Sequence, residues 1–254
     1  LVVDLREEHP DDWSRAVTVM AVSGSQVFDA RVVYESIAGR VRVEHLSENT
    51  FGSLLPSSIY ATAKRQVDLG CALIGTLLVM PFMLLIAAWI RIDSAGPALY
   101  RQKRMGFRGK PFTVWKFRTM RVDADRMGAD AAMTRDNDPR ITRAGRFLRR
   151  TRLDELPQLW NIIKGEMSWI GPRPEAMSLA DLYEDRIPFY AYRHAVRPGL
   201  TGWAQVSQGH VTSVEDVELK LQYDFYYVKY FSLWMDLLVF VKTIRIVLTG
   251  SGAR

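Results

Sequence analysis

An uncharged run of 22 residues, from Leu69 to Ile90, constrains this chain more than any other feature. At about 1.5 Å per residue, a helix of this length measures about 33 Å, which is enough to cross the hydrocarbon core of a bilayer. A helix buried in a soluble protein is rarely so apolar over such a length. We therefore expect a membrane-inserted helix at about residues 67–92.

A proline and two basic flanks shape the expected path of this segment. Pro81 lies near its middle, where it removes a backbone donor and kinks or breaks the helix. Cations precede the run and also follow it (Lys64, Arg65, then Arg91, Arg101, Lys103, Arg104, Arg108 and Lys110). Because positive residues mark the cytoplasmic side, a helix broken at Pro81 that enters and leaves by one leaflet satisfies both clusters. An ordinary kinked span, oriented by the stronger second cluster, is the alternative.

The chain as a whole is basic and rich in apolar residues. It has 254 residues, 48 % of them hydrophobic, and a net charge of +6. This length fits one large domain or one domain with a fragment, and because the sequence begins at Leu1 we expect part of a longer protein. The charge indicates an anionic partner, which is nucleic acid, a membrane surface or a phosphorylated substrate. The single Cys71 excludes an internal disulfide and a thiolate zinc site, and the scattered histidines lack metal-binding spacing.

The chain divides into two expected domains. Residues 1–60 alternate between strand-like and helix-like pieces, with a helix beginning near Trp13 and a strand-like segment at Val41–Leu46. They contain no glycine-rich phosphate loop, so we assign them no dinucleotide and expect a fragment of an upstream α/β domain with its connector. Residues 61–254 form the second domain, which begins with the apolar helix and is polar and motif-dense from about residue 96.

Aromatic residues interleaved with charges mark the end of the chain. They lie between Tyr223 and Trp234, and such amphipathic rings favour the membrane–water interface. Leu233–Leu248 then has the pattern of an amphipathic helix with Lys242 and Arg245 on its polar side. This helix is too charged to span a membrane, so it either lies in the interface or packs in the protein core.

Six arginines stand between Arg140 and Arg152, directly before an acidic pair. Three of them, Arg143, Arg146 and Arg150, have helical spacing and share one face. Guanidinium groups bind phosphate through a planar fork of donors, although such a face can also be solvated or rest on lipid headgroups. Nucleic acid is a poor fit for this segment, because the two acids that follow would face its phosphates.

The acidic pair, Asp154 and Glu155, has the residue types that phosphoryl transfer requires. One carboxylate can attack phosphorus and form an aspartyl-phosphate, and a second can hold Mg²⁺, a hard cation that prefers oxygen ligands. Nearby cations then offset the charge on the transferred group. An Asp-Glu dipeptide on its own is more often surface charge or a first-turn pair favoured by the helix dipole, so its neighbours decide its meaning.

Those neighbours include cations at several rigid places. A strand-like run ends with Lys116 and Arg118, and two turns rich in proline and glycine present Arg173 and Arg197. Together with the arginine-rich segment, these put cations at four positions of rigid backbone around one acidic pair. Such an arrangement fits a substrate with a diphosphate better than a neutral one.

At these motifs the chain resembles the bacterial sugar transferase family, the monotopic polyprenyl-phosphate phosphoglycosyl transferases. The matching stretches are KFRTM at 116–120, DPRITRAGRFLRRTRLDELPQLWNIIKGEMSWIGPRPE at 138–175 and RPGLTGWAQV at 197–206. With the membrane segment they cover residues 60–250. Residues 31–46 look like the connector of the larger members, in which transmembrane helices and a nucleotide-fold-like domain come first.

The resemblance implies a two-step reaction that begins exopolysaccharide, capsule or glycoconjugate synthesis. Asp154 attacks the β-phosphate of a UDP-sugar, releases UMP and holds the phosphosugar covalently until polyprenyl phosphate, usually undecaprenyl phosphate, accepts it. Glu155, together with Asp154, is expected to bind Mg²⁺ or Mn²⁺. The resemblance assigns substrate-phosphate binding to Lys116, Arg118, Arg149, Arg173, Arg197 and Asp224.

The resemblance also implies a fold and a location. The expected fold is an α/β, mainly α, catalytic domain with a re-entrant membrane helix hairpin that breaks at Pro81 and with interfacial amphipathic helices. We expect this domain on the cytoplasmic face of the bacterial inner membrane, without nucleic acid, and larger members often form homodimers. Met80 and Arg152 stand where many members have Ser, which affects the angle of the helix break and the charge beside the acidic pair.

Two other functions fit parts of the sequence. A non-catalytic membrane scaffold in a polysaccharide assembly complex explains the membrane and interfacial helices but not the acidic pair. A nucleic-acid-binding protein explains the positive charge but not the uncharged run of 22 residues. The transferred sugar is not evident from any residue, because glucose, galactose and N-acetylated sugars differ by single hydroxyl or acetyl contacts.

Overall fold

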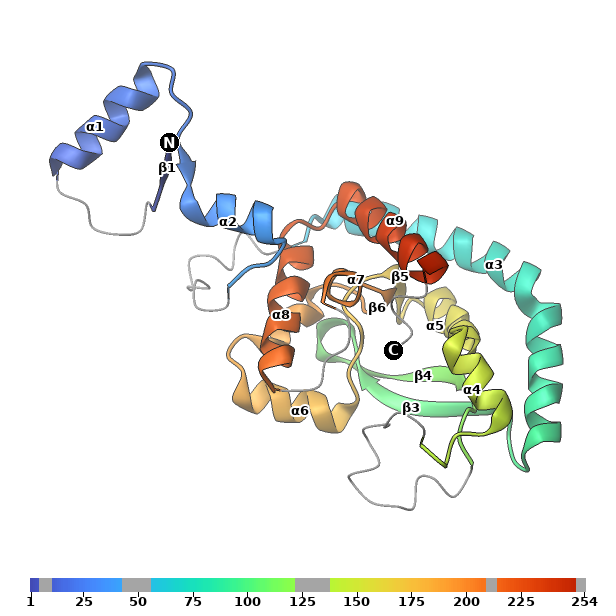
Figure 1. Ribbon diagram of the computed structural model, residues 1–254. Coiled ribbons are helices and arrows are strands. Elements are labelled where there is room, and N and C mark those ends of the chain that lie inside the picture. Colours follow the sequence, from blue (N-terminus) through green and yellow to red (C-terminus); the bar gives the residue numbers. More distant parts are fainter. Residues whose placement is uncertain (5–10, 43–55, 122–137, 209–213, 250–254) are drawn as a thin grey trace.

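Helices dominate the computed structural model, which describes residues 1–4, 11–42, 56–121, 138–208 and 214–249 (Figure 1). Most of the strand-like segment predicted at 41–46 lies outside these residues, as do His9, His45 and His210. In chain order the elements are β1 (Val2–Val3), α1 (Asp11–Val22), β2 (Phe28–Asp29), α2 (Ala30–Ala38), α3 (Ser58–Asp93), β3 (Leu99–Met105), η3 (Phe107–Gly109), β4 (Pro111–Phe117), α4 (Arg143–Arg150), η6 (Leu153–Gln158), α5 (Leu159–Lys164), β5 (Ser168–Ile170), α6 (Met177–Arg186), η7 (Tyr190–Ala195), β6 (Gly199–Thr201), α7 (Trp203–Ser207), α8 (Val214–Lys229) and α9 (Leu233–Thr249).

The N-terminal part is a small β/α piece that projects from the rest of the molecule (Figure 1). Its strands β1 and β2 pair in parallel. Asp29 caps α2, because its side chain accepts a hydrogen bond from the backbone N–H of Arg31, and Gly39 ends the helix with a φ of 64°. The division of the chain into domains at residue 60 stays a prediction.

Helix α2 is held against α8 by a buried carboxylate. Glu35 accepts hydrogen bonds from Lys229 Nζ at 2.7 Å and from the Tyr230 hydroxyl at 2.9 Å. At the end of α2, the indole N–H of Trp203 donates to the carbonyl of Gly39 at 2.6 Å. The segment predicted to be a connector therefore makes specific contacts with the helices that follow.

The predicted apolar helix is α3, and it is longer than the sequence predicts. It extends over 36 residues, from Ser58 to Asp93, because Ser57 caps it and a polar helical stretch precedes the apolar run. Pro81 lies inside this helix, and Figure 1 shows the helix bending along the outer side of the molecule. The structure therefore has one bent helix where the sequence predicts a break. A proline removes one hydrogen bond and kinks a helix, but the turns on either side of it can continue.

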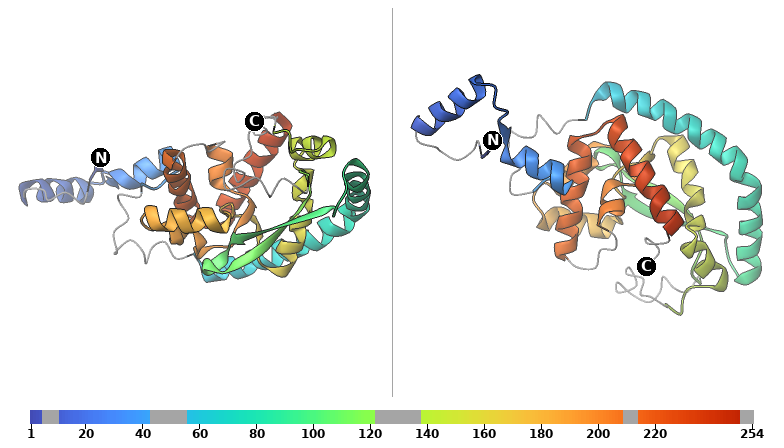
Figure 2. Two further views of the ribbon diagram at one scale, coloured as in Figure 1. Left: turned by 90° about the horizontal axis from the view of Figure 1, so that it is seen from below. Right: turned by 45° about the horizontal axis from the view of Figure 1, so that its top comes forward.

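Most of the apolar surface of α3 faces away from the protein. Only 6 % of its most apolar 18-residue window is buried, and five of its large side chains are 62 % to 75 % exposed (Leu77, Leu78, Phe82, Leu84 and Leu85). Within the described residues this is one helix that is long and apolar enough to cross a membrane by length and composition. Figure 2 shows it curving around the outside of the other elements. This exposure distinguishes α3 from the core helix of a soluble protein.

Two further helices expose apolar side chains. On α9, Met235 and Val239 are buried in the core, whereas Trp234 and Phe240 are more than half exposed. The packing of one face of α9 in the core is thus confirmed, and an interfacial position of its other face stays a prediction. On α4, the exposed ring of Phe147 contacts the ring of Trp89 in α3, with centroids 5.6 Å apart.

Strands β3 and β4 form an antiparallel hairpin in which Leu99 pairs with Phe117 and Met105 with Pro111. Directly opposed residues in such a ladder share a face, and so do alternate residues along each strand. Arg104 therefore projects from the same face as Lys116, which is paired with Tyr100. This face of the hairpin lies beside η6 and α5.

Both turns predicted to present arginines are attached to one short parallel sheet. Strand β5 leads into the turn of Arg173, and β6 follows the turn of Arg197, with Ser168 opposite Gly199. The two backbones approach so closely that a Cβ on Gly171 would lie 2.3 Å from the carbonyl oxygen of Arg197. Only glycine fits at this position, which explains the glycine before Pro172 in the turn.

Candidate active site

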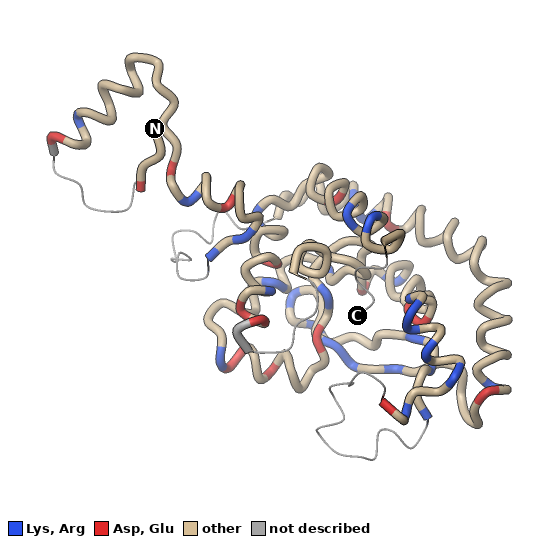
Figure 3. Tube along the Cα trace, viewed as in Figure 1, with Lys and Arg blue, Asp and Glu red and all other residues tan. Residues whose placement is uncertain are grey.

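The acidic pair lies at the start of a short buried helix. Arg152 has a φ of 59°, which turns the chain from α4 into η6, and the first turn of η6 contains Asp154 and Glu155. Their exposed fractions are only 9 % and 8 %. Figure 3 shows that Lys and Arg gather on β3, β4 and α4 in the same part of the molecule. Two buried carboxylates in adjacent positions require compensation by cations.

Glu155 receives that compensation directly. Its Oε1 accepts a hydrogen bond from Arg173 Nη2 at 2.5 Å and another from Lys116 Nζ at 3.1 Å. Burial acts to raise the pKa of Glu155, but the charges of Arg173 and Lys116 outweigh it and hold this pKa well below its usual range. Glu155 is therefore a stable carboxylate, fixed between β4 and the turn that follows β5.

Asp154 differs from its neighbour in having no such partner. Its carboxylate accepts no hydrogen bond from the described residues, and its pKa is raised, first by burial and then by the charge of Glu155. Lys116, Arg149 and Arg173 oppose this rise. The result is a poorly solvated carboxylate whose oxygens are available to a ligand and are more basic than usual.

Arg149 is the third cation near the pair. It lies in the last turn of α4, and its Nε donates to the hydroxyl of Thr119 at 2.9 Å. Burial lowers the pKa of Arg149, while the charge of Asp154 raises it. The structure thus brings three of the predicted cations, Lys116, Arg149 and Arg173, around Asp154 and Glu155.

The donor set around the pair fits a hard divalent cation. Both oxygens of Asp154 and the Oε2 of Glu155 accept no hydrogen bond from the described part of the chain, whereas Glu155 Oε1 accepts two. Mg²⁺ prefers oxygen ligands and is often bound by one or two carboxylates together with substrate phosphates. Within the described residues no group of three acidic, histidine or cysteine side chains could hold a metal by itself. A metal here would therefore take its further ligands from water and from substrate phosphates.

Two predicted phosphate ligands lie away from the acidic pair. Arg118 is buried, and its Nη2 donates to the carbonyl and hydroxyl of Ser94 at 2.6 and 2.8 Å, at the end of α3. Arg197 donates through Nε to the carbonyl of Gly165 at 3.0 Å, and its guanidinium lies 5.1 Å from the ring centroid of Phe107. The structure therefore brings neither side chain against Asp154 or Glu155.

Asp224 also lies away from the pair, but it is connected to it. This fully buried carboxylate accepts hydrogen bonds from Arg193 Nη2 at 2.8 Å and Nε at 3.1 Å. Arg193 Nη2 also donates to the backbone carbonyl of Arg173 at 2.8 Å. Asp224 thus holds the guanidinium of Arg193, which in turn is hydrogen-bonded to the backbone of the turn that contains Arg173.

Arg104 and Arg193 lie near the site, and the sequence predicts neither as a part of it. Arg104 Nη1 donates to the carbonyl of Pro174, and its charge lowers the pKa of Lys116. The alternation of the hairpin puts Arg104 on the face of Lys116, but this signal appears only once the strand pairing is known. Arg193 comes from η7, and no motif marks it in the sequence.

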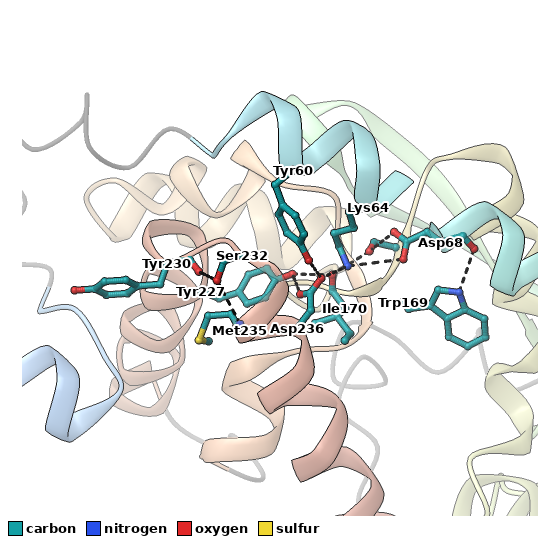
Figure 4. Close-up of polar contacts among 11 residues, drawn as sticks. Tyr60, Lys64, Asp68, Trp169, Ile170, Tyr227, Tyr230, Ser232, Met235 and Asp236 are labelled. Carbon is teal, nitrogen blue, oxygen red and sulfur yellow. Dashed lines mark hydrogen bonds and ion pairs between the residues drawn. The ribbon is translucent and has the colours of Figure 1, made fainter. Parts of the chain in front are cut away.

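A buried network connects α3 to the C-terminal helices (Figure 4). Asp236 of α9 accepts hydrogen bonds from the hydroxyl of Tyr60 at 2.5 Å and from Lys64 Nζ at 2.6 Å. Its other oxygen accepts one from the hydroxyl of Tyr227 at 2.6 Å. Burial and Asp236 keep the pKa of the Tyr227 phenol well above its usual value, so this hydroxyl remains a donor.

The same network reaches β5. The carboxylate of Asp68 accepts a hydrogen bond from the Ser168 hydroxyl at 2.6 Å, and its backbone carbonyl accepts one from the Trp169 indole at 3.2 Å (Figure 4). Lys64 Nζ lies 3.8 Å from the same carboxylate. Because β5 continues into the turn of Arg173, the first turns of α3 and one wall of the site belong to a single hydrogen-bonded unit.

Comparisons with known proteins find a matching family model and several similar relatives. Residues 59–250 match the family model described as bacterial sugar transferase. The chain is 45 % identical, over 255 residues, to the UDP-N-acetylgalactosamine-undecaprenyl-phosphate N-acetylgalactosaminephosphotransferase of Aeromonas hydrophila, and the match covers 100 % of this chain but 60 % of that protein. It is 43 % identical over 204 residues to the UDP-glucose:undecaprenyl-phosphate glucose-1-phosphate transferase of Caulobacter vibrioides, covering 80 % of this chain and 76 % of that protein. The transferase of the same name from Escherichia coli is 41 % identical over 192 residues, which are 74 % of this chain and 40 % of that protein.

Proposed function

Because this chain belongs to the bacterial sugar transferase family, we propose that it transfers a sugar-1-phosphate from a UDP-sugar to undecaprenyl phosphate. The Aeromonas and Caulobacter relatives are named for transfers of this type, one with N-acetylgalactosamine and the other with glucose. One observation carries the proposal, namely that Glu155 is paired with two cations while the adjacent Asp154 is buried without a hydrogen bond from the described residues.

In the first step, a carboxylate oxygen of Asp154 bonds to the β-phosphorus of the UDP-sugar. The bond from this phosphorus to the oxygen that bridges the two phosphates breaks, and UMP leaves with that oxygen. The phosphosugar remains on Asp154 as an acyl phosphate. Lys116, Arg149 and Arg173 offset the negative charge that gathers on the transferred group.

In the second step, a phosphate oxygen of undecaprenyl phosphate attacks the same phosphorus. The bond from phosphorus to Asp154 breaks, which restores the carboxylate and releases a lipid with a diphosphate-linked sugar. UMP leaves before the acceptor reacts, so the kinetics are of the ping-pong type.

We assign Mg²⁺ or Mn²⁺ to Asp154 and Glu155. When bound, the cation would neutralise charge on the donor phosphates and give the Asp154 carboxylate a direct partner, which the described residues do not provide. Removal of divalent cations with EDTA should abolish UMP release, and added Mg²⁺ or Mn²⁺ should restore it. Full activity in EDTA would contradict this assignment.

We further propose that α3 enters and leaves the cytoplasmic leaflet of the inner membrane, with the catalytic domain of residues 61–254 on the cytoplasmic side. Two features support this path. The helix bends along its length and contains Pro81 (Figure 1). Its two ends carry cations, Lys64 and Arg65 at one end and Arg91 at the other, and cations mark the cytoplasmic side.

The proposal is tested by UMP release from the protein in detergent or nanodiscs, with undecaprenyl phosphate, Mg²⁺ and a set of UDP-sugars. Asp154→Asn keeps the shape of the side chain but replaces the nucleophilic carboxylate with a neutral, weakly nucleophilic amide, so we expect its kcat to fall by at least about 10³-fold. Asp185→Asn is the matched control, because Asp185 is exposed on α6 away from the pair, and it should retain wild-type activity. Full activity of Asp154→Asn would exclude a nucleophilic Asp154.

The covalent intermediate is tested separately. Protein incubated with radiolabelled UDP-sugar and no acceptor should retain label on the peptide of Asp154, and the label should leave when undecaprenyl phosphate is added. Product formation without a labelled peptide would indicate a single direct displacement instead. A wild-type protein that turns over no UDP-sugar but binds proteins of a polysaccharide assembly complex would support the scaffold alternative.

A further inference from the structure

A fully buried amide joins the β3–β4 hairpin to the helix after the acidic pair. Asn161 in α5 is 0 % exposed. Its Oδ1 accepts a hydrogen bond from the backbone N–H of Trp115 at 3.2 Å, and its Nδ2 donates to the carbonyl of Thr113 at 2.7 Å. The second proton on Nδ2 is donated to Glu166 Oε2 at 2.7 Å. Because a backbone N–H only donates and a carbonyl only accepts, these partners fix the orientation of the amide.

The two backbone groups lie on the edge of β4 that β3 does not cover. In an antiparallel pair, alternate residues direct their N–H and C=O groups away from the partner strand, and Thr113 and Trp115 are two such residues. The amide of Asn161 has the same donor and acceptor as a peptide group. It therefore takes the place that a further strand would occupy and closes this part of the edge.

The position of this amide matters because it lies between two parts of the site. Lys116 follows Trp115 directly in β4, and η6, which contains the acidic pair, continues directly into α5. The side chains of these two elements meet in the ion pair between Lys116 and Glu155 at 3.1 Å. The hydrogen bonds of Asn161 fix the backbone of β4 against α5. They therefore also fix the distance between β4, which carries Lys116, and η6, which carries Glu155.

We propose that Asn161 is a positioning residue for sugar-phosphate transfer, which keeps Lys116 at its working distance from Asp154 and Glu155. The three hydrogen-bond partners of the Asn161 side chain all belong to the protein, so Asn161 affects the substrate indirectly, through Lys116. Alanine at this position leaves a buried N–H and a buried C=O unpaired, which allows β4 to move. This assignment rests on the proposed function.

A double-mutant cycle between Asn161→Ala and Lys116→Met tests the proposal, with kcat for UMP release as the measured quantity. We expect Asn161→Ala alone to lower kcat by about tenfold, in line with the loss of buried hydrogen bonds. The KM for undecaprenyl phosphate should stay within about twofold of wild type, because the defect lies in the geometry around the pair. In the Lys116→Met background, Asn161→Ala should lower kcat by less than about twofold.

Two outcomes of this cycle would overturn the proposal. One is wild-type kcat in Asn161→Ala. The other is an unchanged tenfold effect in the Lys116→Met background, because it would show that Asn161 acts independently of Lys116. A wild-type protein that releases no UMP removes the proposed function and this assignment together, whereas an active wild type with an equally active Asn161→Ala removes the assignment alone.

A milder variant covers the case in which Asn161→Ala does not fold. Glu166→Ala removes one of the three hydrogen bonds of the amide, and the Glu166 side chain is 30 % exposed, so the variant should fold. We expect kcat to fall by about threefold, again only when Lys116 is present. Lys164→Ala is the matched control, because it breaks the exposed ion pair of Lys164 with Glu166 at 3.6 Å but leaves the contact to Asn161. Equal effects of the two variants would contradict the proposal.

Discussion

Asp154 and Glu155 are neighbours in the chain, yet their surroundings give them opposite acid–base behaviour. Arg173 and Lys116 keep Glu155 ionised, while burial and the charge of Glu155 itself raise the pKa of Asp154. Each carboxylate thus has a different chemical use. Glu155 fixes the cations in place, and the oxygens of Asp154 remain available for a metal or for phosphorus.

The pKa of Lys116 predicts how the reaction depends on pH. Burial and then the charge of Arg173 lower this pKa to about 8, although Glu155 acts in the other direction. Lys116 is therefore positively charged below about pH 8 and becomes neutral above it. Since the cation offsets charge on the transferred phosphate, we expect kcat for UMP release to fall as the pH rises past about 8.

Lys116→Arg separates this effect from other alkaline changes. An arginine stays protonated in proteins, so the variant should retain part of its activity and lose it only at higher pH. The measurement is kcat as a function of pH for both proteins, with each sample shown to remain folded over the range. Identical alkaline limbs would show that another group controls the decline.

Individual site residues differ in how far the sequence predicts their placement. Lys116, Arg149 and Arg173 come together around the acidic pair as expected, because each lies in or next to a regular element whose ends are marked in the sequence. The catalytic and metal-binding roles of these residues stay predictions. Arg118 and Arg197 contact carbonyls of Ser94 and Gly165 instead, because their placement depends on how α3 and α5 end nearby.

At the scale of elements, the sequence predicts that the helix α3 exists but does not predict where it begins. Its apolar run predicts a helix at about 67–92, and the structure has Ser58–Asp93. The additional turns are polar, and their residues Tyr60 and Lys64 are hydrogen-bonded to Asp236 of α9. Asp68, directly after these turns, is buried and hydrogen-bonded to Ser168 of β5. No local pattern reveals such contacts, because the partners lie about a hundred residues or more away in the chain.

These contacts predict that Asp236 is important for stability. Asp236→Ala leaves Lys64 and the hydroxyls of Tyr60 and Tyr227 without their shared acceptor in a buried place. Removing one partner of a buried ion pair typically costs about 3–5 kcal/mol, so we expect a clear fall in the free energy of unfolding. Thermal unfolding in detergent measures this change.

The exposed ion pair of Lys164 and Glu166 provides the comparison. Its side chains are 45 % and 30 % exposed, and the distance is 3.6 Å, so its removal by Lys164→Ala should change the free energy of unfolding by less than about 1 kcal/mol. A similar loss of stability in the two variants would show that the network around Asp236 contributes no more than a surface ion pair.

At the scale of the whole molecule, the elements fall into three parts. The short N-terminal β/α piece lies at one end, the helices and sheets of the site lie in the middle, and α3 curves around the far side (Figures 1 and 2). Along the chain the order is different, because α3 comes between the N-terminal piece and the elements of the site, and the sequence predicts that chain order. It does not predict the contact of α2 with α8 through Glu35, because a lone glutamate in a helix usually faces solvent.

The proposed path of α3 predicts that both of its ends lie on one side of the membrane. Thr62→Cys and Ala95→Cys place exposed thiols near the two ends of α3, in a Cys71→Ala background that removes the natural thiol. A membrane-impermeant maleimide, applied to intact and to opened cells, should label both positions only after opening. Asp185→Cys on α6 marks the side of the catalytic domain. Labelling of the two ends from opposite sides would establish an ordinary span.

The hydrogen bond between Asp68 and Ser168 has a consequence for the depth at which chemistry takes place. A helix inserted in lipid adopts the tilt and depth that match its apolar length to the thickness of the hydrocarbon. Since β5 is tied to α3, the height of Arg173 above the lipid tails is set by that match. A thicker or thinner bilayer should therefore raise or lower the whole reaction centre relative to the headgroups, and turnover should be greatest in lipids of one chain length.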